Sequence, residues 1–183
     1  MKYIMLLRGI NISGKNKISM SELRSALEEN DFRKVITHQN SGNVILESDF
    51  SSKQTLSQTV SEIIKEKFQL EIPIFITTEI ELEDVLNHCP DWWDTNDKNI
   101  YNNLIFIIPP ASFDEVYTTI GEPSKNIDKI KEYKNHIFWS FDLKNYRKSN
   151  WWIKTANSII KDKITIRTAN TIKKVLQLCK NNT

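Results

Sequence analysis

The segment that follows the first predicted strand carries the residues best suited to chemistry. Residues 9–16 read GINISGKN, which is one residue away from the phosphate-binding pattern G-x-x-x-x-G-K-[ST]. In that pattern the final hydroxyl holds a magnesium ion, and Asn16 occupies its place here. The pattern also requires a parallel strand before the loop, whereas the strands of this chain indicate an antiparallel sheet. The sequence therefore disfavours a nucleoside triphosphatase.

A simpler anion site is the hypothesis that remains for this segment. Arg8, Lys15 and Lys17 lie on a glycine-containing loop close to the beginning of a predicted helix. Exposed backbone N–H groups, the positive end of a helix dipole and several cations together favour an anion. Two interpretations stay open, namely an anion-binding loop and a solvated basic loop whose glycines only form turns.

The sequence contains none of the other common catalytic patterns. The three histidines have no metal-ligand spacing, and the His88-Cys89 step does not form a zinc motif. We therefore expect no metal and no cofactor. Whether the protein is an enzyme stays open, because Arg8, Lys15 or Arg167 could stabilise charge without a metal. No nucleophile or base can be named for such a reaction.

Composition sets broad limits on the location and partners of the protein. The chain has 183 residues and a net charge of +2, from 25 basic and 23 acidic side chains. No apolar run approaches the roughly 18 residues of a membrane span, so no membrane partner is expected. Cys89 and Cys179 lie far apart and suit a reducing compartment as free thiols. These features predict a cytoplasmic protein.

Hydrophobic periodicity predicts the order βαββαβ twice, which is the ferredoxin-like motif. We expect an α+β fold with two such halves and antiparallel sheets, plus a linking helix and a C-terminal helix. The predicted divisions are 1–78, a linking helix and loop over 79–103, and 104–183. The apolar strands over 72–76 and 104–108 indicate that both sheet faces are covered. The other half, the extra helices or a partner subunit could provide that cover.

Three segments resemble a known bacterial family, catalogued as domain of unknown function 1697. They are LLRGINISGKNKISMSELR over 6–24, NSGNVI over 40–45, and TIRT with NT over 165–171. The resemblance implies a duplicated ferredoxin-like architecture and brings no biochemical activity with it. The chain departs from the family at His38, Asn40 and Ala169. The family's motif residues correspond here to Arg8, Gly9, Asn11, Gly14, Lys15, Asn16, Lys17, Ser41, Gly42, Asn43, Arg167, Asn170 and Thr171.

These observations lead to one candidate site and several candidate functions. We expect Arg8 and Lys15 to share an anion at one end of the first sheet, with Arg167 joining them. The favoured partner is a phosphorylated small molecule. RNA is an alternative that rests on the aromatic residues of the strand over 136–141, and a homodimer that does not catalyse a reaction is another. The candidate anion-binding residues are Arg8, Asn11, Lys15, Lys17, Asn43, Arg167 and Asn170.

Overall fold

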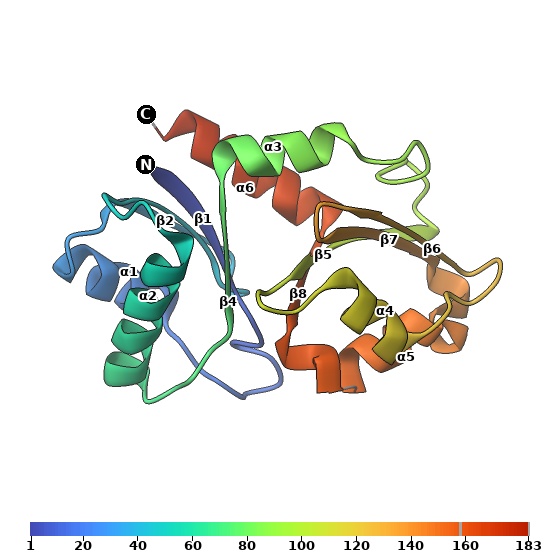
Figure 1. Ribbon diagram of the computed structural model, residues 1–183, viewed down its shortest axis with the longest axis horizontal. Coiled ribbons are helices and arrows are strands. Elements are labelled where there is room, and N and C mark those ends of the chain that lie inside the picture. Colours follow the sequence, from blue (N-terminus) through green and yellow to red (C-terminus); the bar gives the residue numbers. More distant parts are fainter. Residues whose placement is uncertain (158, 183) are drawn as a thin grey trace. The chain divides into compact units, whose positions relative to one another are not determined.

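The described residues form two antiparallel sheets of four strands each (Figure 1). The computed structural model describes residues 1–157 and 159–182. The strand order is β2-β3-β1-β4 in the first sheet and β6-β7-β5-β8 in the second. The predicted α+β class with two β-α-β-β-α-β halves is confirmed. The strands are β1 (Lys2–Leu7), β2 (Arg33–His38), β3 (Asn43–Glu47), β4 (Ile74–Thr78), β5 (Ile100–Ile107), β6 (Asp128–Tyr133), β7 (His136–Asp142) and β8 (Ile164–Thr168).

Three of the helices begin after a serine that caps the first turn. Ser19 and Ser112 each accept a hydrogen bond from the backbone three residues later. Ser52 caps the second helix by accepting from the Thr55 amide at 3.3 Å. The helices are α1 (Met20–Glu29), α2 (Lys53–Phe68), α3 (Glu79–Asn87), α4 (Phe113–Ile120), α5 (Asn150–Asn157) and α6 (Ala169–Asn181), with short 3-10 helices at Leu143–Lys148 and Ile159–Asp162.

The chain divides into two compact units, and the boundaries fall inside α3 and α6. The first unit contains residues 1–83 and the end of the chain from Lys174, and the second contains residues 84–173. These units follow packing, whereas the predicted divisions at 78 and 104 follow the order of elements. Among the described residues, no helix combines the length and apolar character needed to cross a membrane.

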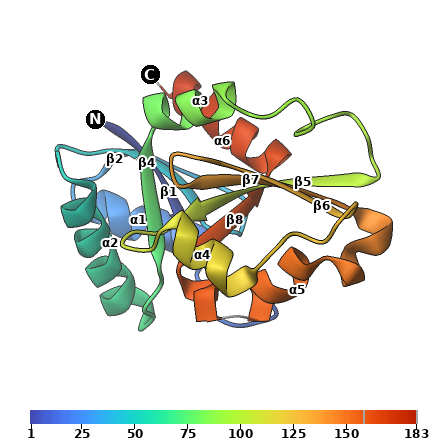
Figure 2. The same cartoon turned by 45° about the vertical axis from the view of Figure 1, so that its right-hand side comes forward.

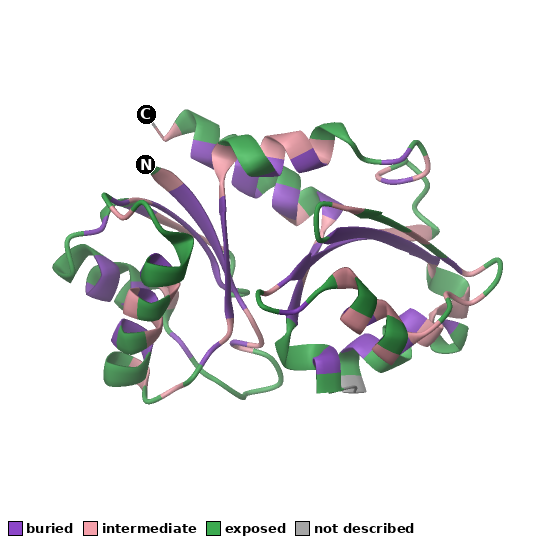
Figure 3. Cartoon of the chain, in the orientation of Figure 1, coloured by how far each residue is buried: buried purple, intermediate pink, exposed green. Residues whose placement is uncertain are grey.

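The first unit packs α1 and α2 on one face of its sheet (Figures 1 and 2). Alternate residues of β1, among them Met5, join the core beneath these helices. The strand residues between them, such as Ile4, are buried as well, as Figure 3 shows for the strand as a whole. Lys2 on this second face donates to the carbonyl of Cys179 at 3.1 Å, so α6 covers part of that face.

The second unit packs α4 and α5 against its sheet around Trp139 and Trp151. On the other face, Trp93 makes an edge contact with Phe138 at 5.1 Å between ring centroids. The Trp93 indole also donates to the backbone carbonyl of Asn103 at 2.7 Å. The segment before β5 therefore covers part of the second face. The strand β5 begins at residue 100, four residues before the predicted start, and its polar residues Asn102 and Asn103 pair there with Ser140 and Trp139 of β7.

Candidate functional site

The loop between β1 and α1, residues 8–19, has a tightly folded backbone. Five of its residues have positive φ angles, and the two glycines among them, Gly9 and Gly14, lie at 68° and 77°. A left-handed conformation costs most residues about 1–2 kcal/mol, and glycine avoids that cost. The Lys15 amide donates to the carbonyl of Ile12 at 2.9 Å, which closes a turn at the loop tip. The loop is therefore held by its own hydrogen bonds.

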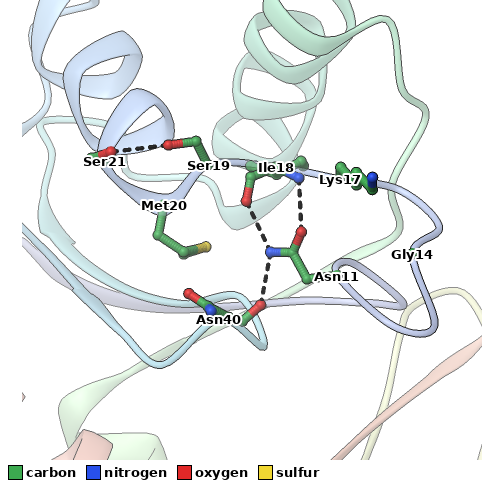
Figure 4. Close-up of a pocket in the computed structure, with 8 residues that line it drawn as sticks. All are labelled: Asn11, Gly14, Lys17, Ile18, Ser19, Met20, Ser21 and Asn40. Carbon is green, nitrogen blue, oxygen red and sulfur yellow. Dashed lines mark hydrogen bonds between the residues drawn. The ribbon is translucent and has the colours of Figure 1, made fainter.

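Asn11 is the anchor of this loop (Figure 4). Its Nδ2 donates to the carbonyl of Ile18 at 2.8 Å and to the carbonyl of Asn40 at 2.9 Å, and its Oδ1 accepts from the Ile18 amide at 2.9 Å. The side chain thus joins both ends of the loop to the β2–β3 turn. Asn11 was predicted as a ligand-binding residue, and its amide group is occupied by these three bonds.

The β2–β3 turn, residues 39–42, packs against the loop over residues 8–19. Asn43 is fully buried, and its Nδ2 donates to the carbonyl of His38 at 2.8 Å and to Ser41 Oγ at 3.0 Å. Gly42 has a φ of 78°, and a Cβ added there would lie 2.7 Å from the Cβ of Leu7. Only glycine fits this close approach. Both predicted motif residues of the turn therefore have clear structural roles.

An open pocket of about 490 Å³ lies between the loop and the first turn of α1 (Figure 4). Two predicted site residues, Asn11 and Lys17, line it, whereas its lining does not include Arg8, Lys15 or Asn43. The remaining lining residues come from the loop, the helix start and the neighbouring turn, and they are Gly14, Ile18, Ser19, Met20, Ser21 and Asn40. Ser19 Oγ and Ser21 Oγ lie 2.9 Å apart at the helix start.

The electrostatics of the pocket are set by two exposed lysines. Lys15 and Lys17 are both solvent-exposed. Within residues 1–157 and 159–182, neither of them forms an ion pair at 4.0 Å or less. Glu22 is the acidic residue in the first turn of α1 and opposes the helix dipole there. Arg8 is half-buried, and its amide donates to the carbonyl of Pro73 at 2.9 Å.

Arg167 and Asn170, the last two predicted site residues, belong to the second unit. Arg167 is 7% exposed, and its guanidinium donates to Thr165 Oγ1 at 2.9 Å and to the carbonyl of Ile166 at 2.8 Å. Asn170 is exposed in the first turn of α6. Thr168 caps this helix by accepting from the Thr171 amide at 3.2 Å. That Arg167 shares an anion with Arg8 and Lys15 stays a prediction.

The other groups that could do chemistry are dispersed or buried. In the part of the chain that the structure describes, no three His, Cys, Asp or Glu side chains are arranged to hold a metal ion. Cys89 and Cys179 are both free thiols. Phe138, Trp139 and Phe141, on which the RNA alternative rests, are at most 2% exposed. These three rings are therefore not available to stack on bases.

Comparison with known proteins places the chain in a family. The family model described as "Protein of unknown function (DUF1697)" matches residues 1–138. The chain belongs to this family. A solved structure of a conserved bacterial protein from Streptococcus pneumoniae is similar throughout, with 27% identity over 97% of this chain and 98% of that one, and a TM-score of 0.85. No curated protein matches the chain.

The pocket lies within the segment that the DUF1697 model matches, yet the sequence predicts only two of its eight lining residues, Asn11 and Lys17, as ligand contacts. The six others are Gly14, Ile18, Ser19, Met20, Ser21 and Asn40. One signal was available for Ser21, because first-turn residues of a helix face any ligand held at its N-terminus. No local signal existed for Asn40, which reaches the pocket through pairing of distant segments.

Proposed function

We propose that this DUF1697 protein binds a phosphorylated small molecule at the loop over residues 8–19. The observation that carries the proposal is the open pocket at the N-terminus of α1, which is lined by Lys17 and by Gly14, the residue before Lys15. Among the described residues, both lysines lack an acidic partner. A bound phosphate would supply the negative charge that the protein itself does not place beside them.

The groups around the pocket have different roles in binding the phosphate. Lys17 contacts the anion, and the hydroxyls of Ser19 and Ser21 with the first free amides of α1 donate hydrogen bonds to it. Lys15 raises the local potential from the loop tip. Because Glu22 offsets part of the helix dipole, the lysines provide most of the attraction. Asn11 positions the loop and does not touch the ligand.

The alternatives receive less support. RNA recognition through the strand aromatics is disfavoured by their burial. Catalysis by charge stabilisation alone would use the same lysines, but it still lacks a base or nucleophile, so binding is the proposed role. The two free thiols suit a reducing compartment, and we propose a cytoplasmic location on that basis.

A thermal-shift screen with inorganic phosphate, nucleotides and phosphorylated sugars tests the proposal. A compound present at a hundred times its dissociation constant adds about 2.7 kcal/mol to stability, which raises the melting temperature by roughly 5–10 °C. Lys17→Ala should abolish the shift and Lys15→Ala should reduce it. Lys67→Ala is the matched control, because Lys67 is an exposed lysine of the same unit at the far end of α2.

Two results would overturn this function. One is a screen in which no phosphorylated compound changes the melting temperature. The other is a hit whose shift survives in the Lys17→Ala variant and is unchanged in Lys15→Ala. Both alanine variants should melt within about 2 °C of the parent without ligand, because exposed surface changes alter stability by about 0.5 kcal/mol or less.

A further inference from the structure

A second surface, remote in sequence from the loop, combines exposed apolar side chains with positive charge. It is formed by the exposed side chains of residues 143–153 and is called here the 143–153 surface. Leu143, Trp152 and Ile153 are 40%, 42% and 47% exposed. The other exposed large apolar side chains among the described residues come from separate elements, and they are Met1, Ile12, Ile80 and Ile159. Leu143, Trp152 and Ile153 are instead grouped within eleven residues of the chain.

The helix α5 is apolar on the side that faces its own core and also on the side that faces solvent. Trp151 and Thr155 are buried, and the Trp151 indole donates to the carbonyl of Gly121 at 3.0 Å. Trp152 and Ile153 point outward from the same helix and are joined by exposed Ala156 one turn later. The packing of the second unit accounts for the buried side, whereas Trp152 and Ile153 keep 42% and 47% of their surface in solvent.

Trp152 is held in place by aromatic neighbours. Its ring lies edge-on to Tyr146 at 5.6 Å and tilted against Phe141 at 5.3 Å. The Arg147 guanidinium lies over the Tyr146 ring at 5.6 Å. A contact residue that is already ordered loses little conformational entropy when a partner binds. The arrangement therefore presents a fixed apolar ring beside a fixed cation.

The charge on this surface has one sign. Residues 143–153 contain three basic residues, Lys144, Arg147 and Lys148, and no acidic residue. Ser124 Oγ donates to the carbonyl of Lys148 at 3.0 Å, which brings the exposed Lys125 close to the same surface. Two acids adjoin the surface. Asp142 accepts from the Lys144 amide at 2.8 Å and from Asn145 at 2.7 Å, and the backbone carbonyl of Glu122 accepts from Asn150 at 3.0 Å. Basic side chains outnumber these acids, which favours an anionic partner.

The sequence predicts no membrane partner because it lacks a spanning segment, but a surface can bind a bilayer without crossing it. We propose that the 143–153 surface docks onto an anionic lipid bilayer. Tryptophan, isoleucine and leucine side chains enter the boundary between headgroups and acyl chains, and lysine and arginine pair with anionic headgroups around them. A polyanion such as RNA would pair with the cations but would leave Leu143 and Ile153 in water. A second copy of the chain would bring like charges together across a two-fold axis. The bilayer satisfies both the apolar and the basic side chains.

Vesicle sedimentation at low ionic strength tests the proposal with the full chain. We expect binding to vesicles of mixed phosphatidylglycerol and phosphatidylcholine, little binding to pure phosphatidylcholine, and a blue shift of tryptophan emission on binding. The double variant Lys144→Glu with Lys148→Glu should weaken binding by at least about 30-fold, since each cation near such a surface contributes about a factor of five. Trp152→Phe should remove most of the blue shift while vesicle binding persists.

The matched control is the double variant Lys129→Glu with Lys131→Glu. Both lysines are exposed on β6 of the same unit, and the change in net charge is identical. This control should bind as the parent does. The proposal is wrong if phosphatidylglycerol vesicles do not bind the protein, or if the control loses binding equally. It is also wrong if single-stranded RNA binds through Trp152 while vesicles do not, or if the 144/148 variant instead breaks a dimer seen by sedimentation.

Discussion

Replacing Asn11 with alanine should destabilise the first unit by about 3–4 kcal/mol. Three hydrogen bonds of 2.8–2.9 Å are lost, and each contributes about 0.5–1.5 kcal/mol net. Asn11 also has a φ of 54°, and alanine in this left-handed conformation costs about another 1 kcal/mol. Together these terms make Asn11 a larger contributor to stability than an ordinary loop residue.

Two further substitutions at this position separate the terms. Asn11→Gly removes the hydrogen bonds but tolerates the left-handed backbone, so its cost should be about 1 kcal/mol smaller. Asn11→Asp keeps the acceptor for the Ile18 amide and loses both donor bonds, so it should cost about 2 kcal/mol. The control is Asn16→Gly, because Asn16 also has a positive φ, of 46°, and its Nδ2 donates an exposed hydrogen bond to the carbonyl of Gly9 at 3.1 Å. Its cost should stay below about 0.5 kcal/mol.

Urea unfolding followed by far-UV circular dichroism measures these differences. All five tryptophans lie between residues 92 and 152, so tryptophan fluorescence reports the second unit while circular dichroism reports both. The reasoning is refuted if Asn11→Ala costs less than about 1 kcal/mol and abolishes ligand binding. That outcome would mean that Asn11 contacts the ligand, as the sequence predicts.

Three other substitutions or measurements follow from the structure. Gly42→Ala should cost at least about 2 kcal/mol in urea unfolding, because its Cβ would lie 2.7 Å from a neighbouring Cβ and its φ is positive. In the native protein a thiol reagent should react quickly with exposed Cys89 and slowly with Cys179, because burial and then the nearby carboxylate of Glu79 raise the pKa of Cys179 to about 12. Glu81 loses some solvation on burial, but hydrogen bonds from Lys53 and the Thr78 backbone outweigh this and lower its pKa from 4.5 to about 2. Because its pKa is lower in the folded protein, ionised Glu81 stabilises the fold above pH 4.5, and this stabilisation is lost as the pH falls toward 2. In urea unfolding at neutral pH the parent should be more stable than Glu81→Gln by roughly 1 kcal/mol. This difference should disappear between pH 4.5 and pH 2.

The elements of the fold could be predicted because their signals are local. Apolar residues at helical or alternating spacing mark each helix and strand, and Ser19 with Glu22 or Thr78 with Glu81 marks a helix start. The start of β5 is an element boundary that local sequence signals do not predict. Polar Asn102 and Asn103 resemble a loop in sequence, and they are strand residues because they pair with Ser140 and Trp139 of β7, which lie far away in the sequence.

The candidate site was harder to predict because its residues act through distant partners. Asn11 and Asn43 have the polar side chains that are typical of ligand contacts, yet the side-chain amides of both form hydrogen bonds within the protein. The partner of Asn11 at Asn40 lies 29 residues away, and no pattern in the sequence indicates that pairing. Lys15 and Lys17 could be predicted as charges on a loop, and their lack of an acidic partner among the described residues required the structure.

The duplication itself points to the loop over 8–19. The two halves repeat the same order of elements, so the connection between the first strand and the first helix can be compared within one chain. In the second half β5 ends at Ile107 and α4 begins at Phe113, which leaves five residues, whereas in the first half the corresponding connection has twelve, from Arg8 to Ser19. Five residues therefore suffice for this crossover. The remaining length of the first loop is not required by the fold, and it contains the left-handed turns, both lysines and one side of the pocket. Because a loop held rigid beyond what its scaffold needs is a common place for a ligand site, this asymmetry supports the loop as the functional part of the chain.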